Sequence, residues 1–143
     1  MSAVVKVLRL PAPDRRRVLE AVAQLARASI ELRVRPSSRA VALLGTLRRG
    51  EADEGVGAEQ AREAERVGRD VARVAARLFW RPTCLRQALA VRRMLRRRGI
   101  SSELHLGVTS ASVGEAHAWV TVDGHPVVGR PGLERFVPLA AFR

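Results

Sequence analysis

Apolar residues recur at helical spacing through most of the first hundred residues. The pattern predicts a long helix that begins at Asp14, as N-cap after Pro13, and two further long helices over residues 58–79 and 84–98. A shorter helix is expected over residues 39–48. The side chains expected to face the core are Val18, Leu19, Val22, Leu25, Ala26 and Ile30 in the first long helix, Ala61, Val67, Val71, Val74, Ala75 and Leu78 in the second, and Cys84, Leu85, Ala88, Val91 and Leu95 in the third.

After residue 100 the apolar period changes to two, which is typical of strands. Strands are predicted over residues 104–108 and 116–122, and a return strand over residues 126–129 follows a hairpin turn at Asp123-Gly124. A short last strand is expected over residues 135–139. Helices followed by an antiparallel sheet indicate the α+β class.

Length and cysteine content limit the class of protein further. A chain of 143 residues is about the size of one domain and can bury a core without a disulfide or a metal. We expect a single domain over residues 1–143, mainly helical over residues 1–79, with the helix from Cys84 and the strands in residues 80–143. Because Cys84 is the one cysteine, an internal disulfide and a zinc site with two cysteine ligands are excluded.

The expected cellular location follows from the absence of long apolar runs. The N-terminal residues have no apolar stretch of signal-peptide length, and Pro11 interrupts them early. No run approaches the ~18 apolar residues that a membrane span needs. We therefore expect a cytoplasmic protein without a membrane partner.

The formal net charge of +12 comes almost wholly from arginine, because Lys6 is the one lysine among 26 basic residues. A charge of this size suits an acidic partner such as a peptide or a nucleic acid, although a GC-rich coding bias also explains it. Aromatic residues are 3% of the chain, which argues against a stacking platform for single strands. The basic run at residues 92–98 is read as a solvated helix face, so nucleic acid is not an expected partner.

Cys84 and His117 are the candidate catalytic residues. Cys84 falls in the first turn of a predicted helix, where the partial positive charge of the helix end favours the thiolate. Taken alone, a single cysteine is more often a small buried apolar residue. His117 lies on a later strand with Trp119 and Thr121 on the same face. A cysteine at a helix start followed by a histidine on a strand is the order of papain-like and transglutaminase-like sites, in which the imidazole takes the thiol proton.

The third group that would orient the imidazole is missing from the expected place. Across the hairpin, His117 faces Gly129 or Arg130, and Asp123 in the turn is roughly 20 Å away. Glu134 lies further along the chain and can fold back. The site can therefore run as a Cys-His dyad, use Glu134, or orient His117 through a backbone carbonyl or a water.

Two tryptophans and two further histidines complete the candidates. Trp80 and Trp119 are near the catalytic residues in sequence, so each is read as a substrate-pocket wall or as core packing. His105 and His125 are expected at the surface. No two histidines have the spacing of metal ligands, so neither a metal nor a cofactor is expected.

Four stretches together carry a resemblance to a known family. PTCLRQALAVRRMLRRRGI, SELHLGV, AHAWVTVDGHPV and RFVPL resemble the stand-alone leader peptidases of lasso peptide biosynthesis, which are similar to the microcin-processing, transglutaminase-like cysteine proteases. The resemblance covers residues 80–139, and the arginine-rich helical part is less specific. Cys-Leu-x-x-Ala-Leu with Ala-His-Ala-Trp-Val some 30 residues later is a more specific combination than either motif.

The resemblance implies a cysteine protease with a Cys-His-Asp triad, in which Cys84 is the nucleophile and His117 the general base. The Asp of the family usually stands about a dozen residues after the histidine, where this chain has Gly129, and we expect Gly129→Asp to restore it. The implied reaction cuts one amide bond between the leader and the core of a ribosomally made precursor. The implied partners are that precursor, a separate leader-recognition protein and an ATP-dependent lasso cyclase.

Two other classes of function remain open at this point. A transglutaminase-like acyltransferase would use the same thioester chemistry with an amine, instead of water, as the acceptor. A basic module that binds a peptide or a nucleic acid would need no catalysis, and Cys84→Ala would leave its function intact.

Overall fold

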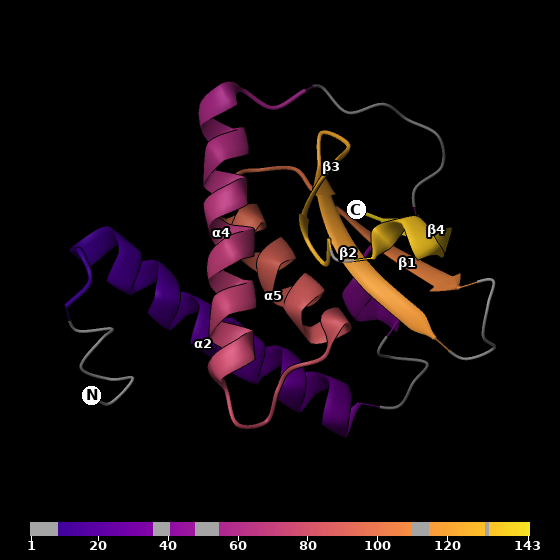
Figure 1. Cartoon of the computed structure of the whole chain (residues 1–143), viewed down its shortest axis with the longest axis horizontal. Helices are drawn as coiled ribbons and strands as arrows, with labels where there is room; N and C mark the ends of the chain where they lie inside the picture. Colours follow the sequence, from indigo (N-terminus) through magenta and orange to yellow (C-terminus); the bar gives the residue numbers. More distant parts are fainter. Residues whose placement is uncertain (1–8, 36–40, 48–54, 110–114, 131) are drawn as a thin grey trace.

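The computed structural model describes residues 9–35, 41–47, 55–109, 115–130 and 132–143. Its helices are α2 (Ala12–Val34), α4 (Ala58–Arg77) and α5 (Cys84–Arg97), with short 3-10 turns η1 (Val41–Leu44) and η2 (Leu133–Arg135). Its strands are β1 (Glu103–Thr109), β2 (Ala116–Val122), β3 (His125–Val128) and β4 (Phe136–Phe142). They form an antiparallel sheet in the order β3-β2-β1-β4, and the helices cover one side of it (Figure 1). The predicted α+β architecture is confirmed.

Helices α4 and α5 lie where the apolar spacing predicts them. Helix α4 begins at Ala58 and ends two residues before the predicted end, and α5 ends one residue early. Gly99 adopts a φ of +68°, in the left-handed region, and closes α5 as predicted. Thr83 occupies the N-cap position of α5, but its side chain makes no capping hydrogen bond.

Helix α2 differs from the prediction in its start and in its buried face. It begins at Ala12 with Pro11 as N-cap, so Asp14 lies in the first turn. Its buried residues are Ala21, Gln24, Leu25 and Ala28. The predicted core residues Leu19 and Ile30 are 56% and 61% exposed. The inward face is set by close packing of small side chains and by ion pairs to α4 and α5, which a hydrophobic stripe does not reveal.

The helix expected over residues 39–48 is shorter in the structure. Residues 41–44 form the 3-10 turn η1, whereas residues 39, 40 and 48 lie outside the described part of the chain. Thr46 then exchanges two backbone hydrogen bonds with Arg143, and Leu47 forms a bridge to Phe142. This segment therefore crosses to the end of β4, which brings it beside α5.

The sheet has two distinct faces because side chains alternate along each strand. Leu104 pairs with Val120 and Leu106 with Ala118, and all four belong to or pack against the core shared with the helices. The alternate residues include His105, which pairs with Trp119, and Gly107, which pairs with His117. The β2–β3 hairpin turns at Asp123-Gly124 as predicted, with positive φ at both residues. Strand β4 runs to Phe142, three residues beyond the predicted end.

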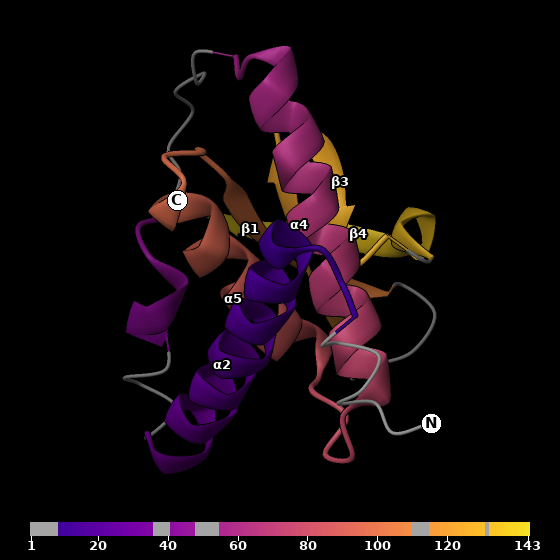
Figure 2. The same cartoon turned by 90° about the vertical axis from the view of Figure 1, so that its left-hand side faces the viewer.

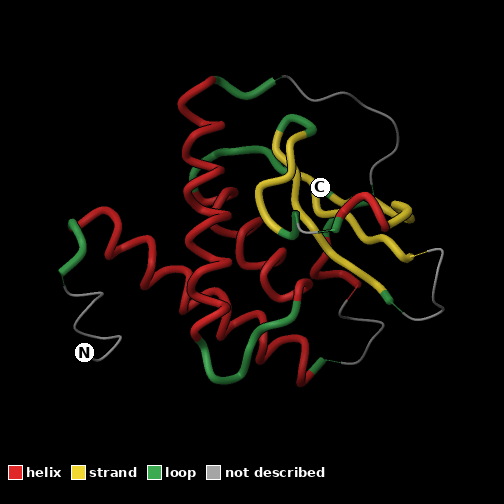
Figure 3. Tube along the Cα trace, in the orientation of Figure 1, coloured by secondary structure: helices red, strands yellow, loops and turns green. Residues whose placement is uncertain are grey.

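One hydrophobic core joins the helices to the sheet. Figure 2 shows α2 crossing in front of α4 and α5, with the strands behind them, and Figure 3 shows the helices gathered on one side of the strands. Helix α4 touches β3 at Gly68, where a Cβ would overlap the carbonyl group of Val127. In the described residues, no helix is both long and apolar enough to cross a membrane.

Candidate active site

Cys84 is the first residue of α5, as predicted, and is partly buried against the core. The N–H groups of a first helical turn have no partner within the helix, and together they carry partial positive charge. The first turn of α5 contains no acidic residue that would neutralise this charge. A thiolate and a developing oxyanion are both stabilised at such a position.

The loop between α4 and α5 sets the direction in which α5 begins. Arg81 has a φ of +38°, an uncommon value for a residue with a Cβ, and its N–H donates to the carbonyl of Leu78. Pro82 follows and is buried, and its carbonyl accepts a hydrogen bond of 2.9 Å from the side chain of Gln87. The strained turn and this bond together hold the chain just before the thiol.

Trp80 lies in the same loop. Its ring meets that of Phe79 edge to face at 4.9 Å, and Phe79 is 93% exposed. The indole N–H of Trp80 is buried and has no hydrogen-bond partner in the described part of the chain. An unpaired buried donor is uncommon and invites an explanation. The predicted role of Trp80 as a pocket wall stays a prediction.

His117 is held by a backbone carbonyl. Its Nε2 lies 2.7 Å from the carbonyl oxygen of Gly129. A carbonyl can only accept, so Nε2 carries the proton and Nδ1 of the neutral ring is left with a free lone pair. Of the three arrangements that the sequence leaves open, the structure therefore shows orientation through a carbonyl. The residue that supplies it stands where the resembled family has its Asp.

Four rings form a continuous row that includes the imidazole of His117. His105 stacks on Trp119 at 5.3 Å, Trp119 on His117 at 6.1 Å, and His117 on Phe136 at 4.8 Å. Trp119 is 7% exposed, so the contacts that the structure shows for it are packing contacts with the two histidines. A substrate contact of Trp119 stays a prediction. The stacking partners limit the tilt of the His117 ring, while the carbonyl of Gly129 fixes its rotation.

Two glycines make this row possible. A Cβ at Gly107 would lie 2.9 Å from the outer ring atoms of Trp119 and 2.8 Å from the carbonyl oxygen of Val137. Gly129 has a φ of +79°, and a Cβ there would lie 2.8 Å from the carbonyl oxygen of Ala118. The expectation that Gly129→Asp restores a triad stays a prediction, and this backbone opposes it, since position 129 accepts no side chain without strain.

Among the described residues, Glu134 makes no hydrogen bond with His117, and His105 is less exposed than the sequence suggests. Glu134 is exposed in η2, and the hydrogen bond of His117 goes to Gly129 instead. Glu134 as a third catalytic member stays a prediction. His105 is partly buried, with Nε2 2.8 Å from the hydroxyl of Thr121, so its expected surface position is wrong. His125 is exposed as expected.

His117 alternates along β2 with Ala118 and Val120, which face the helices, whereas Cys84 packs against the core on the helix side of the sheet. The first turn of α5 and the first residues of β2 lie toward the lower end of the molecule in Figure 1. The described residues contain no hydrogen bond between the thiol of Cys84 and the ring of His117. Catalytic hydrogen bonds are often long before substrate binds, so the pairing of Cys84 with His117 stays a prediction.

Sequence reasoning missed Phe136 and Gly107, and it left the Gly129 carbonyl as one of several ways to orient His117. The first two lie far from Cys84 in sequence and carry no reactive group, so only the strand register identifies them. The carbonyl belongs to the backbone and leaves no signal in residue type. Among the described residues there is also no group of three or more His, Cys, Asp or Glu side chains that could hold a metal ion.

Comparison with known proteins agrees with this fold. Residues 28–141 match the family model described as the transglutaminase-like superfamily. The matched range includes both Cys84 and His117. No curated protein and no solved structure matches the chain.

Proposed function

Because the chain belongs to the transglutaminase-like superfamily, which comprises cysteine proteases and acyltransferases, we propose that it is a cysteine peptidase. Its proposed substrate is the precursor of a lasso peptide, from which it removes the leader by hydrolysis of one amide bond. The four sequence stretches over residues 80–139 support this substrate class. In this proposal Cys84 is the nucleophile and His117 the general base.

The hydrogen bond from His117 to the carbonyl of Gly129 is the observation that carries the proposal. It fixes the tautomer in which Nδ1 is free to accept a proton. This orientation supports a role for Nδ1 as the proton acceptor of the proposed reaction. Cys84 supplies the thiol, at the start of α5 where the backbone N–H groups have no partner within the helix.

The first half of the reaction forms a thioester. Nδ1 of His117 takes the proton from Cys84, and Sγ attacks the carbonyl carbon of the bond to be cut. The negative charge on the former carbonyl oxygen is stabilised by the N–H of Cys84 at the helix end. His117 then returns the proton to the leaving amine, which departs as the new N-terminus of the core peptide.

The second half releases the leader. A water gives a proton to His117, and its oxygen attacks the thioester carbonyl, so that the leader leaves with a new carboxylate and Cys84 recovers its proton. The reaction needs no cofactor. The freed amine of the core peptide is the group that an ATP-dependent cyclase would join to a side-chain carboxyl.

Trp80 is proposed to border the substrate site. Its buried N–H without a partner supports this role, because a carbonyl of the bound peptide would satisfy it. The separate leader-recognition protein is proposed to present the precursor to this site.

The decisive experiment mixes the protein, the leader-recognition partner and the cognate precursor, and reads the products by mass spectrometry. The wild-type chain is compared with Cys84→Ala and His117→Ala. His125→Ala is the matched control, because His125 is an exposed histidine in the neighbouring strand β3. We expect one cut at the leader–core junction, no cut with Cys84→Ala, and a rate lower by about 10²–10⁴ with His117→Ala.

The product masses separate the alternatives. Hydrolysis adds one water to the cut bond, whereas an acyltransferase adds the mass of the amine acceptor. If the precursor stays whole with the wild-type protein, the peptidase proposal is wrong. Equal rates for His117→Ala and His125→Ala would remove His117 from the mechanism.

A further inference from the structure

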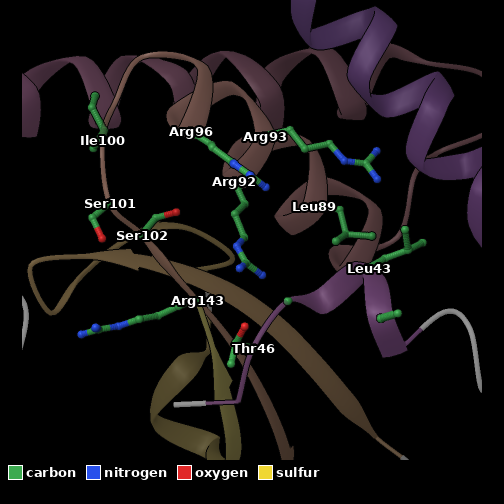
Figure 4. A pocket seen from close by; sticks show the side chains of 12 residues that line it. Leu43, Thr46, Leu89, Arg92, Arg93, Arg96, Ile100, Ser101, Ser102 and Arg143 are labelled. Atoms are coloured by element: carbon green, nitrogen blue, oxygen red, sulfur yellow. The ribbon is translucent and has the colours of Figure 1, made fainter. Parts of the chain in front are cut away.

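A basic pocket lies between α5, the segment around Gly45 and the end of β4. Its volume is about 590 Å³, and arginines 92, 93, 96 and 143 are among its twelve lining residues. None of the lining residues is acidic. Figure 4 shows the guanidinium of Arg92 extending from α5 into the space above Thr46. We call this site the arginine pocket.

Two arginines of this pocket, Arg92 and Arg93, are incompletely neutralised by the described residues. Arg92 has no carboxylate partner in the described residues and donates instead to the carbonyl oxygen of Leu44. Arg93 pairs with Glu31 through Nη2, but its Nη1 is buried without a hydrogen-bond partner among those residues. Arg143 has a carboxylate partner, since its Nη2 lies 3.7 Å from Oε1 of Glu103. Burial and the charge of Arg96 both lower the pKa of Arg92, so the protonated guanidinium is held at a cost that a bound anion would relieve.

The backbone is shaped to admit Arg92 at this place. Gly45 has a φ of +95°, and a Cβ there would overlap the guanidinium of Arg92 and the carbonyl of Arg143. A side chain at position 45 would therefore displace Arg92 from the pocket. The fold keeps a half-buried, positively charged group in a concave site, although exposure to solvent would be less costly.

The other lining residues favour a peptide over a nucleic acid. Ala42 and Leu43 supply apolar surface, with Leu89 and Ile100 buried behind them, and Thr46 and Ser102 supply hydroxyl groups. The lining contains no aromatic side chain on which a base could stack. Guanidinium groups bind carboxylates in a bidentate manner, and the apolar residues suit the aliphatic part of a neighbouring side chain.

We infer that the arginine pocket binds carboxylate side chains of an acidic peptide segment. Arg92 follows Cys84 by eight residues on α5, which is about 12 Å along the helix axis. An extended peptide needs about four residues to cover that distance. If the proposed function holds, the segment belongs to the precursor and lies at least four residues from the cut bond.

Binding can be measured without any cleavage. The probe is a fluorescein-labelled peptide of twelve residues with four glutamates and two leucines, followed by fluorescence anisotropy against the whole chain. Its twin carries glutamine at the four glutamate positions. Separate arms use a twelve-residue oligothymidylate and inorganic phosphate as competitors. We expect the acidic peptide to bind about tenfold more tightly than its twin. We expect neither competitor to displace the acidic peptide when it is added at the same concentration of negative charges.

Arg96→Gln is the test variant, because Arg96 is exposed and its loss should not disturb folding. Arg97→Gln is the matched control, since Arg97 is exposed on the same helix, pairs with Glu20 and does not line the pocket. Both variants lose one positive charge. We expect Arg96→Gln to weaken the acidic peptide about fivefold or more and Arg97→Gln to leave its affinity unchanged.

Three results would overturn the inference. They are equal binding of the two peptides, equal weakening by both arginine variants, and tighter binding of the oligothymidylate than of the acidic peptide. The last result would assign the pocket to a nucleic acid. Because no bond is cut in this assay, an absence of peptidase activity would leave its outcome intact, so the two proposals fail separately.

Discussion

The arginines of the helical layer and His117 on the sheet are held in different ways. Between helices, arginines pair with carboxylates far away in the sequence. Arg17 of α2 pairs with Asp70 of α4, and Arg98 after α5 reaches Glu20 of α2 at 2.7 Å and Glu63 of α4 at 3.2 Å. On the sheet, His117 is held by neutral groups, namely a carbonyl and two stacked rings.

The difference distinguishes contacts that join structural elements from a contact that orients a candidate catalytic group. An ion pair fixes both partners in one charge state, which suits groups that join elements permanently. A carbonyl orients an imidazole but adds no formal charge, which suits the proposed role of His117 as a general base. In the proposed mechanism, a carbonyl would stabilise the imidazolium of His117 less than the carboxylate of an Asp would.

The largest effect is expected at Arg17, the centre of the interhelical pairs. Its side chain is 12% exposed and that of Asp70 is 13% exposed. Arg17→Met leaves Asp70 partly buried without its partner, so we expect a loss of about 2–3 kcal/mol in the free energy of unfolding, measured with urea. Asp14 and Glu63, which also contact Arg17, add to the uncompensated charge.

Arg62→Met is the control for Arg17→Met. Arg62 pairs with Glu59 on the exposed side of α4, where solvent screens the interaction. This control should leave the urea midpoint unchanged. If Arg17→Met also leaves it unchanged, the interhelical pairs do not stabilise the fold, and the contrast with the sheet loses its basis.

A smaller effect on stability is expected when a charge is brought to the sheet. Gly129→Asp places a Cβ against the carbonyl of Ala118 and forces an L-residue to a φ of +79°. We expect a loss of about 2 kcal/mol in the free energy of unfolding and no gain in cleavage rate. Gly99→Ala is the control, because its φ is +68° but its Cβ would meet nothing within 4 Å. It isolates the cost of the backbone conformation.

A different result would change the interpretation of His117. If Gly129→Asp is as stable as Gly99→Ala and cuts the precursor faster than the wild-type chain, position 129 can hold a third catalytic member. The carbonyl would then be a weaker substitute for Asp rather than the group that this backbone requires.

The elements could be predicted from the sequence because their signals are local. Gly99 ends α5, Asp123-Gly124 turns the hairpin, and alternation places Ala118 and Val120 on the core face of β2. The buried face of α2 could not be predicted, because Arg17 and Glu20 pair with residues 53 and 78 positions away. Long-range pairs leave no periodic pattern in the sequence.

The same distinction between local and long-range signals applies to the candidate site. The positions of Cys84 and His117 on a helix start and a strand follow from local pattern and from the family resemblance. The Gly129 carbonyl, the stacked ring of Phe136 and the arginine pocket depend on strand register and on contacts between distant segments. Glycine and arginine have many structural uses, so residue type alone does not indicate these roles.

The smallest of the three effects is expected at Glu31, and it depends on pH. Burial alone would raise the pKa of Glu31, but hydrogen bonds and charges from Arg27 and Arg93 outweigh it and lower the pKa below the ordinary value of 4.5. A carboxyl whose pKa is lowered by folding stabilises the protein above its unfolded-state pKa. That contribution is lost as the pH falls through the folded-state pKa.

Glu31→Gln therefore tests whether helical ion pairs govern acid sensitivity while the sheet does not. We expect a loss of about 1 kcal/mol in the free energy of unfolding near pH 7, which shrinks below about pH 4.5 as the wild-type carboxyl takes up its proton. Urea unfolding at several pH values measures the difference. Glu115→Gln, at an exposed carboxyl beside β2, is the matched control for the loss of one acidic side chain. A Glu31→Gln deficit that stays constant into acid would show that Glu31 stabilises the fold by packing rather than by charge.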